Sequence, residues 1–86
     1  MTYSVKIRKQ AKKILDSLPN KLKSRIAEKI YILGHNPDNK ILDIESLTNS
    51  NLLRLRGGSW RIVFSRDDYI KVISIEKIKP RGDIYK

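Results

Sequence analysis

The chain has 86 residues, no cysteine and a net charge of +10, with 19 Lys and Arg against 9 Asp and Glu. This length predicts one domain over residues 1–86, and the lack of cysteine excludes disulfides and thiolate metal sites. No apolar stretch is long enough to cross a bilayer and the start lacks the features of a secretion signal, so we expect a cytoplasmic protein without a membrane partner.

The first part of the chain predicts one strand followed by two helices. Residues 2–7 alternate apolar and polar side chains, as a half-buried strand does. From about Arg8 the apolar spacing is helical, Pro19 is suited to the start of a second helix, and the GHNP run at 34–37 ends that helix. The side chains expected to face the core are Tyr3, Val5, Ile7, Ala11, Ile14, Leu15, Leu18, Leu22, Ile26, Ile30 and Leu33.

The second part predicts strands. Residues 38–50 mix apolar and acidic side chains, and we expect a loop there, with a single helical turn as the alternative. This segment holds three of the nine acids, and we expect it to lie beside the basic face. The GGS run at 57–59 predicts a hairpin turn and RDD at 66–68 a second turn. The β-branched residues that follow, Ile70 among them, suit a central strand. The three expected strands cover about 52–57, 60–66 and 69–76.

These elements predict an α+β fold in the order β-α-α-β-β-β, with two antiparallel helices packed on one face of a small, mostly antiparallel sheet. The other face of the sheet is then open. The period of two in LRLR at 53–56 sends both leucines to one face and Arg54 and Arg56 to the other. Several arginines on an open face favour a phosphate-rich ligand, whereas protection of an exposed strand from aggregation is the alternative.

The positive charge is spread through the predicted elements instead of being confined to a tail. Such a charge attracts polyanions over long range, so nucleic acid and an acidic protein are both suitable partners. An anionic membrane surface is a weaker third option, because the predicted helices carry no Trp or Phe on an apolar face. A basic surface that serves only solubility is the remaining interpretation.

The sequence lacks the residue combinations that most enzymes use for catalysis. His35 is the only histidine, expected to face solvent at the end of a helix, so we expect no metal site. There is no catalytic triad, phosphate-binding loop or dinucleotide fingerprint, and we expect no cofactor. The remaining Arg, Lys and Tyr side chains are able to cleave RNA without a metal. RNA supplies its own 2′-hydroxyl nucleophile, and the protein aligns it and neutralises the phosphate charge.

The whole chain resembles the RelE-type toxins of the RelE/ParE superfamily, in a form close to archaeal members. Three stretches carry the resemblance: YSVKI at 3–7 leading to Leu18-Pro19, LRLRGGSWRIVF at 53–64, and the ending KPRGDIYK at 79–86. The middle stretch is similar to the family's arginine-bearing hairpin, and the ending to its basic terminus with a tyrosine. The resemblance implies the RelE-like microbial RNase fold.

The resemblance also implies a function and partners. RelE-type toxins are ribosome-dependent mRNA endonucleases that cut the message in the ribosomal A site by 2′-hydroxyl attack and need no metal. Membership implies a RelB-like cognate antitoxin, often with an acidic stretch, with which the toxin forms a hetero-oligomer. The expected partners are therefore the antitoxin, the ribosome and mRNA.

Site residues follow from the resemblance. Arg61 matches a phosphate-stabilising arginine, Arg81 a tail arginine, Tyr85 a tyrosine that stacks on the base or transfers a proton, and Arg54 a basic position that contacts RNA. These four are the expected catalytic residues. The expected nucleic-acid-binding residues are Lys79, Arg56, Lys77 and Lys86.

Two positions qualify this interpretation. Some members carry a lysine, suggested as a proton acceptor, where this chain has Leu52, so the general base stays open. Trp60 shares a face with Ile62 and Phe64, and we expect it to pack in the core or hairpin instead of stacking on a base.

Three rival functions remain at this stage. A ParE-like toxin of the same fold inhibits DNA gyrase and is not a nuclease, and its chains usually lack the paired arginines and the terminal tyrosine. A small nucleic-acid-binding module without catalysis also fits the charge. An inactive toxin that only forms a complex with its antitoxin is the third.

Overall fold

A computed structural model describes residues 2–80 of the chain, so the predicted site residues Arg81, Tyr85 and Lys86 lie outside the described residues. The elements are β1 (Ser4–Ile7), α1 (Lys9–Ser17), α2 (Asn20–His35), β2 (Ile44–Ser46), β3 (Leu53–Gly57), β4 (Trp60–Asp67) and β5 (Val72–Pro80). None of the helices within 2–80 is long and apolar enough to cross a membrane.

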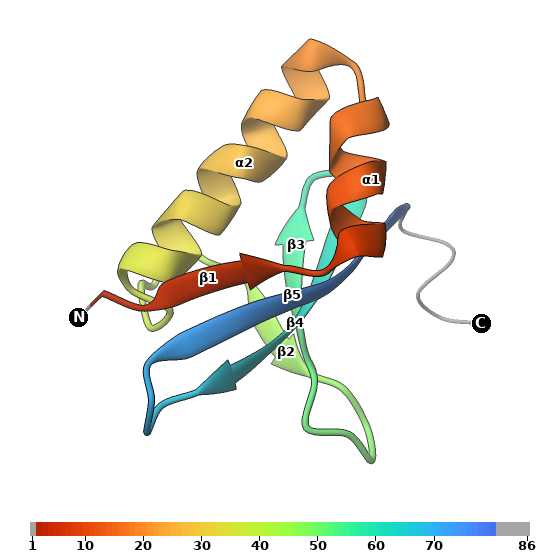
Figure 1. Ribbon diagram of the computed structural model, residues 1–86. Helices are drawn as coiled ribbons and strands as arrows, with labels where there is room; N and C mark the ends of the chain where they lie inside the picture. Colours follow the sequence, from red (N-terminus) through yellow and green to blue (C-terminus); the bar gives the residue numbers. More distant parts are fainter. Residues whose placement is uncertain (1, 81–86) are drawn as a thin grey trace.

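The five strands form one mixed sheet in the order β1-β5-β4-β3-β2. β1 pairs in parallel with β5, and the other three pairs are antiparallel. The two helices lie on the same side of this twisted sheet (Figure 1), where α1 packs on β5 and α2 on β3. The predicted α+β class, with two helices on one face of a mostly antiparallel sheet, is confirmed.

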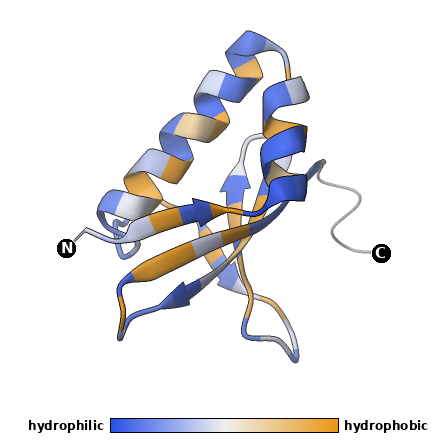
Figure 2. Ribbon diagram, viewed as in Figure 1, coloured by the Kyte–Doolittle hydropathy of each residue, from blue (hydrophilic) through white to orange (hydrophobic). Residues whose placement is uncertain are grey.

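The core lies between the helices and the sheet, as the apolar spacing predicts, except that Ile14, expected in the core, is exposed. Along α2, Ile26 and Leu33 are fully buried, and from the sheet Phe64 and Ile75 meet them in the same cluster. Apolar and polar bands alternate along both helices (Figure 2), because only one stripe of each helix faces the sheet. Trp60 packs against this cluster while remaining half-buried, which agrees with the expected packing role.

Gly34 lets the end of α2 approach β1 closely. The amide of Tyr3 donates to the carbonyl of Gly34 at 2.7 Å. A Cβ placed on Gly34 would lie 2.5 Å from Cγ2 of Val5, a β-branched side chain with little freedom to move aside. The glycine at this position is therefore required by packing.

Replacing Gly34 with Ala is expected to lower the free energy of unfolding by about 1–3 kcal/mol, because the overlap with Val5 outweighs the better helix propensity of alanine. Denaturant unfolding of the variant checks this value. The Val5→Ala change removes the clashing methyl group, so the double variant should lose less than the sum of the two single changes. Additive losses would show that the close contact is not the cause.

β2 corrects the prediction of a loop over residues 38–50. Ile44, Glu45 and Ser46 pair with Leu55, Arg54 and Leu53 of β3, which extends the sheet by a strand. Glu and Ser have weak strand propensity, and three residues give too little pattern to recognise. The strand forms because its backbone pairs with the edge of β3 that faces away from β4.

The turn before β5 corrects the boundaries of the last strand. The Asp67 carboxylate accepts bonds from the amides of Tyr69 and Ile70 at 3.0 and 3.2 Å, and Lys71 has a positive φ of 57°. Residues 69–71 therefore form a turn, and Ile70 is exposed where a buried strand residue was expected. β5 starts at Val72 and continues through Lys77 and Lys79, which were assigned to a tail.

A network of polar side chains lies at the end of the sheet next to this turn. Arg66 donates to Asp68 at 2.7 Å and to Asp38 at 3.0 Å, and the Tyr3 hydroxyl donates to Asp68 at 2.8 Å. The Arg66 guanidinium first, and then the Tyr3 hydroxyl, hold the pKa of Asp68 below its ordinary value. The same carboxylates, Asp38 before Asp68, raise the pKa of Arg66. This network joins Tyr3, the residue before β1, to β4 and to the segment after α2, at the end of the sheet far from Trp60.

Candidate functional site

The sheet face away from the helices carries a row of cations from three strands. In the register, Arg56 of β3 stands opposite Arg61 of β4, and Arg61 stands opposite Lys79 of β5. In the next row, Val63 lies between Arg54 and Lys77. Because side chains alternate across a sheet and Leu55 and Ile62 belong to the core, these rows lie on the opposite face. The sequence-predicted Arg54, Arg56, Arg61, Lys77 and Lys79 are thus brought together on one face.

Arg61 is the most enclosed cation of this face, with only 2% of its surface exposed. Its Nη1 donates to the carbonyls of Gly58 at 2.9 Å and of Trp60 at 3.0 Å, which folds the guanidinium back over the hairpin turn. Its Nε is buried without a hydrogen-bond partner, and its Nη2 donates to no group, among residues 2–80.

No carboxylate pairs with Arg61 among the described residues. A buried cation without a counter-ion is costly, because the solvation it has lost is not replaced. An anion bound beside Arg61 would offset that cost. The sequence predicted that Arg61 lies on this face, but it did not predict its burial, which depends on how the side chain folds over the turn.

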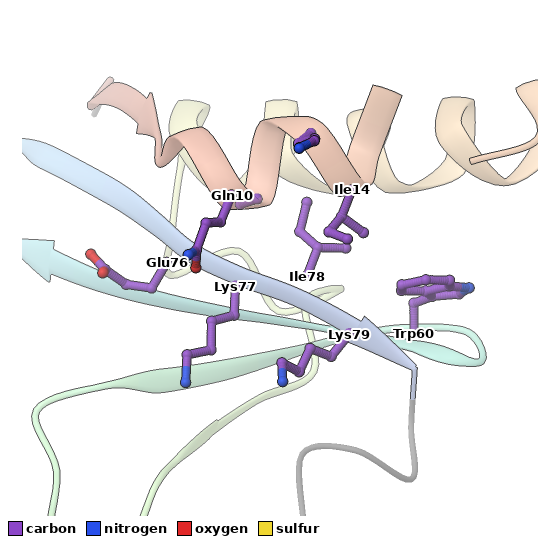
Figure 3. Close-up of a pocket in the computed structure, with 9 residues that line it drawn as sticks. Gln10, Ile14, Trp60, Glu76, Lys77, Ile78 and Lys79 are labelled. Atoms are coloured by element: carbon purple, nitrogen blue, oxygen red, sulfur yellow. The ribbon is translucent and has the colours of Figure 1, made fainter. Parts of the chain in front are cut away.

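Lys77 and Lys79 extend from β5 away from α1 (Figure 3). Lys77 is exposed and Lys79 half-buried, and neither pairs with a carboxylate in the part of the chain that the structure describes. Their place within a strand fixes their spacing relative to Arg61, which a tail would not do. Flexible ammonium groups beside a planar guanidinium suit an anion with several oxygen atoms.

The two arginines of β3 differ from the expectation of an open arginine face. Arg54 is 8% exposed and its Nη2 donates to the Glu45 carboxylate, while Arg56 forms an ion pair with Asp43 at 3.3 Å between Nε and Oδ2. The prediction that Arg54 is solvent-exposed is wrong, because β2 pairs with β3 and places Glu45 beside Arg54. On this face, and among residues 2–80, the positive charge without a carboxylate partner therefore lies on β4 and β5.

Asp43 and Glu45, expected in an acidic loop beside the basic face, lie next to and within β2 and pair with Arg56 and Arg54, which the sequence interpretation did not specify. Both are exposed, while Leu42 is buried and Ile44 packs against the core. This alternation is the period of a strand and was the available signal. No group of three or more His, Cys, Asp or Glu side chains that could hold a metal ion occurs within residues 2–80.

The chemistry open to this face is anion binding and charge stabilisation. Arg61 and Lys79 are cross-strand neighbours, and the Cβ atoms of such neighbours lie about 5 Å apart. Long cationic side chains that start this close together on one face are able to reach the non-bridging oxygens of one phosphate group. His35 is exposed at the end of α2, where it stacks on Tyr31 in the helix layer, so it takes no part in this face.

Solved structures provide the comparison with known proteins. The chain is similar to a structure described as the archaeal RelE-RelB complex from Pyrococcus horikoshii OT3, with 41% identity and a TM-score of 0.82, over 95% of this chain and 98% of that one. A RelB-RelE antitoxin-toxin complex from Methanococcus jannaschii matches at 24% identity and a TM-score of 0.75, over 94% and 95% of the two chains.

The isolated E. coli RelE toxin also matches, with 16% identity, a TM-score of 0.71, and coverage of 98% of this chain and 92% of that one. Because this structure contains RelE alone, the similarity in the complexes is to their RelE chains. No protein-family model and no curated protein matches the chain.

Proposed function

The chain belongs to the RelE family of toxins, and from this premise we propose that it is the toxin of a type II toxin–antitoxin pair and cuts mRNA bound in the ribosomal A site. The observation that carries the proposal is Arg61, a buried guanidinium with no carboxylate partner among the described residues, next to Lys79. This arrangement suits a phosphate group on which negative charge increases during the reaction.

The proposed reaction uses the message's own 2′-hydroxyl and no metal. Its oxygen attacks the adjacent phosphorus, the new O2′–P bond forms, and the P–O5′ bond breaks. The products are a 2′,3′-cyclic phosphate and a 5′-hydroxyl end. The 2′-hydroxyl proton passes to a base and another proton goes to the leaving 5′ oxygen. Arg61 and Lys79 stabilise the charge on the non-bridging oxygens.

The other cations of the face have supporting roles in this proposal. Lys77 and Arg56, both exposed, bind neighbouring phosphates of the message. Arg54 is largely enclosed and bonded to Glu45, so its contribution to catalysis is an indirect electrostatic one, reduced by that carboxylate. A buried charge acts over a longer range than an exposed one because less solvent screens it.

Three tail residues enter the proposal from the family resemblance alone, since they lie outside the described residues. Arg81 would add phosphate charge stabilisation, Tyr85 would stack on a base or exchange a proton, and Lys86 would bind the backbone. The residue at the family's lysine position is Leu52, a side chain that cannot accept a proton. The general base therefore has no assignment.

The proposed partners are an antitoxin and the ribosome, both met in the cytoplasm. The similar archaeal structures are complexes of RelE with RelB, which supports a RelB-like antitoxin for this chain. The net charge of +10 favours an antitoxin with an acidic segment and favours approach to ribosomal RNA.

Expression of the chain without an antitoxin in growing cells tests the proposed function. The expected result is rapid arrest of protein synthesis, with new mRNA ends within translated codons and intact chromosomal DNA. An Arg61→Met variant, expressed to the same level, should leave messages intact. DNA breaks with intact messages would instead indicate a gyrase inhibitor and would refute the proposal.

A further inference from the structure

A groove with a volume of about 620 Å³ lies between α1 and β5, next to the cationic face (Figure 3). Its apolar wall includes Ile14 from α1 together with Ile78 and Trp60 from the sheet. Ile78 and Trp60 point toward α1, whereas Lys77 and Lys79 extend the other way. Its volume falls in the range of sites for small organic groups.

The groove opens where the sheet has a free edge. β1 pairs with β5 only as far as Ile75, whose carbonyl accepts the last bond, from the Arg8 amide, at 2.9 Å. Beyond that point, residues 76–80 of β5 pair with β4 alone among the described strands. A chain lying on the cationic face can therefore cross this edge into the groove without displacing a strand.

The polar groups at the groove favour a nucleotide as its occupant. Lys13 lines the groove from α1 and Lys79 lines it from β5, with the Lys79 ammonium turned toward the cationic face. The one lining carboxylate, that of Glu76, is engaged by Arg8 at 3.2 Å. Gln10 adds an amide that both donates and accepts hydrogen bonds, as the edge of a base does. The groove thus combines an aromatic ring and apolar side chains with a cationic face across its open edge, a combination that suits single-stranded nucleic acid.

We propose that this groove binds one nucleobase of a single-stranded RNA, stacked against Trp60, next to the phosphate held by Arg61 and Lys79. The inference rests on the proposed function for its choice of RNA, and it adds a base-binding subsite and a specificity element. Lys79 links the two sites, because it pairs with Arg61 across the sheet and also lines the groove. Gln10 is the group that would distinguish one base from another.

Fluorescence of Trp60, the only tryptophan in the chain, reports on the groove directly. The probe is a six-nucleotide 2′-O-methyl RNA, which cannot be cut, and a matched series in which one position at a time lacks its base. The full oligonucleotide should quench Trp60. One abasic position should remove most of the quenching and weaken binding roughly tenfold, since stacking of a single base on an aromatic ring contributes on this scale.

A pair of exposed isoleucines provides matched variants that leave the core intact. Ile14→Asp places a carboxylate in the groove, while Ile41→Asp makes the same change at a position away from it. The first should weaken binding of the RNA at least tenfold, and the second should change it less than twofold. Equal effects of the two variants would overturn the subsite.

The remaining outcomes separate the subsite from the proposed function. Oligonucleotides that bind equally well with and without each base would overturn the base-binding groove and leave phosphate binding in place. Failure of the wild-type protein to bind any RNA, with ribosomal cleavage also absent, would refute the proposed function itself. Quenching or a spectral shift of Trp60 by an acidic peptide but not by RNA would assign the groove to a protein partner and overturn the proposal.

Discussion

Replacing Arg61 with Met is expected to lower the rate of mRNA cleavage on ribosomes by a factor on the order of 10²–10³, because a charge-stabilising donor inside an enclosed site is lost. The same change should leave the free energy of unfolding within about 1 kcal/mol of the wild type, since methionine fills similar apolar space and removes a buried cation that has no carboxylate partner among the described residues. Loss of the hydrogen bonds that Arg61 donates to the carbonyls of Gly58 and Trp60 lowers the free energy of unfolding and offsets part of this gain. Single-turnover cleavage and thermal unfolding measure the two effects.

A matched control distinguishes the role of the Arg61 guanidinium from the effect of the protein's overall positive charge. Lys9 is exposed on α1, in the helix layer, so Lys9→Met removes one positive charge without touching the cationic face. It should reduce cleavage only a few-fold, and less at higher salt. If Arg61→Met were no worse than Lys9→Met, the guanidinium would have no particular role at the phosphate.

Replacing Phe64 with Ala is expected to cost about 3–5 kcal/mol of folding stability, the usual range for a fully buried aromatic side chain. A chain of 86 residues has a total stability on the order of 4–13 kcal/mol, so much of the protein should be unfolded at growth temperature. Phe64 lies on β4 beside Val63, and the same strand holds Arg61 on the opposite face. Loss of the core contact would therefore remove the site as well.

The exposed Tyr69 provides the control for this prediction. It is 94% exposed in the turn before β5, so Tyr69→Ala should change the free energy of unfolding by less than about 0.5 kcal/mol. Urea unfolding of both variants gives the comparison. Similar losses for the two would mean that Phe64 contributes no more than a surface aromatic, in conflict with a core centred on β4.

The elements with a strong local pattern were predictable from the sequence. Helical spacing gave α1 and α2 to within a residue or two, and the glycine pair at 57–58 gave the β3–β4 hairpin. The inward orientation of Leu55 and Ile62 follows from strict alternation along short strands. Each of these features depends on residues close together in the chain.

The features that were missed depend on contacts between distant residues. β2 exists because β3 offers a free edge, and the Asp67 carboxylate moves the turn beyond position 68 by bonding to the amides that follow it. The enclosure of Arg61 and the pairing of Arg54 with Glu45 depend on side-chain conformation across the sheet. Alternation placed both arginines on the correct face, but it could not tell which of them has a carboxylate neighbour.

The groove beside β5 could not be predicted from the sequence either. The expectation that Trp60 packs in the core is correct, since it contacts the core cluster, but part of its surface also lines the groove under α1. A period of two assigns a side chain to one face and does not show that the strand pairing ends at Ile75. That gap in the pairing creates the opening.

Cleavage of a ribosome-bound message with a single 2′-deoxynucleotide at the cut position tests the central claim most directly. Wild-type protein is predicted to cut the all-ribose message, leave a 2′,3′-cyclic phosphate, and spare the message with the deoxy substitution, while Arg61→Met cuts neither at a comparable rate. Intact all-ribose message, or equally fast cutting of the deoxy-substituted one, would contradict attack by the 2′-hydroxyl on a phosphate held at this face.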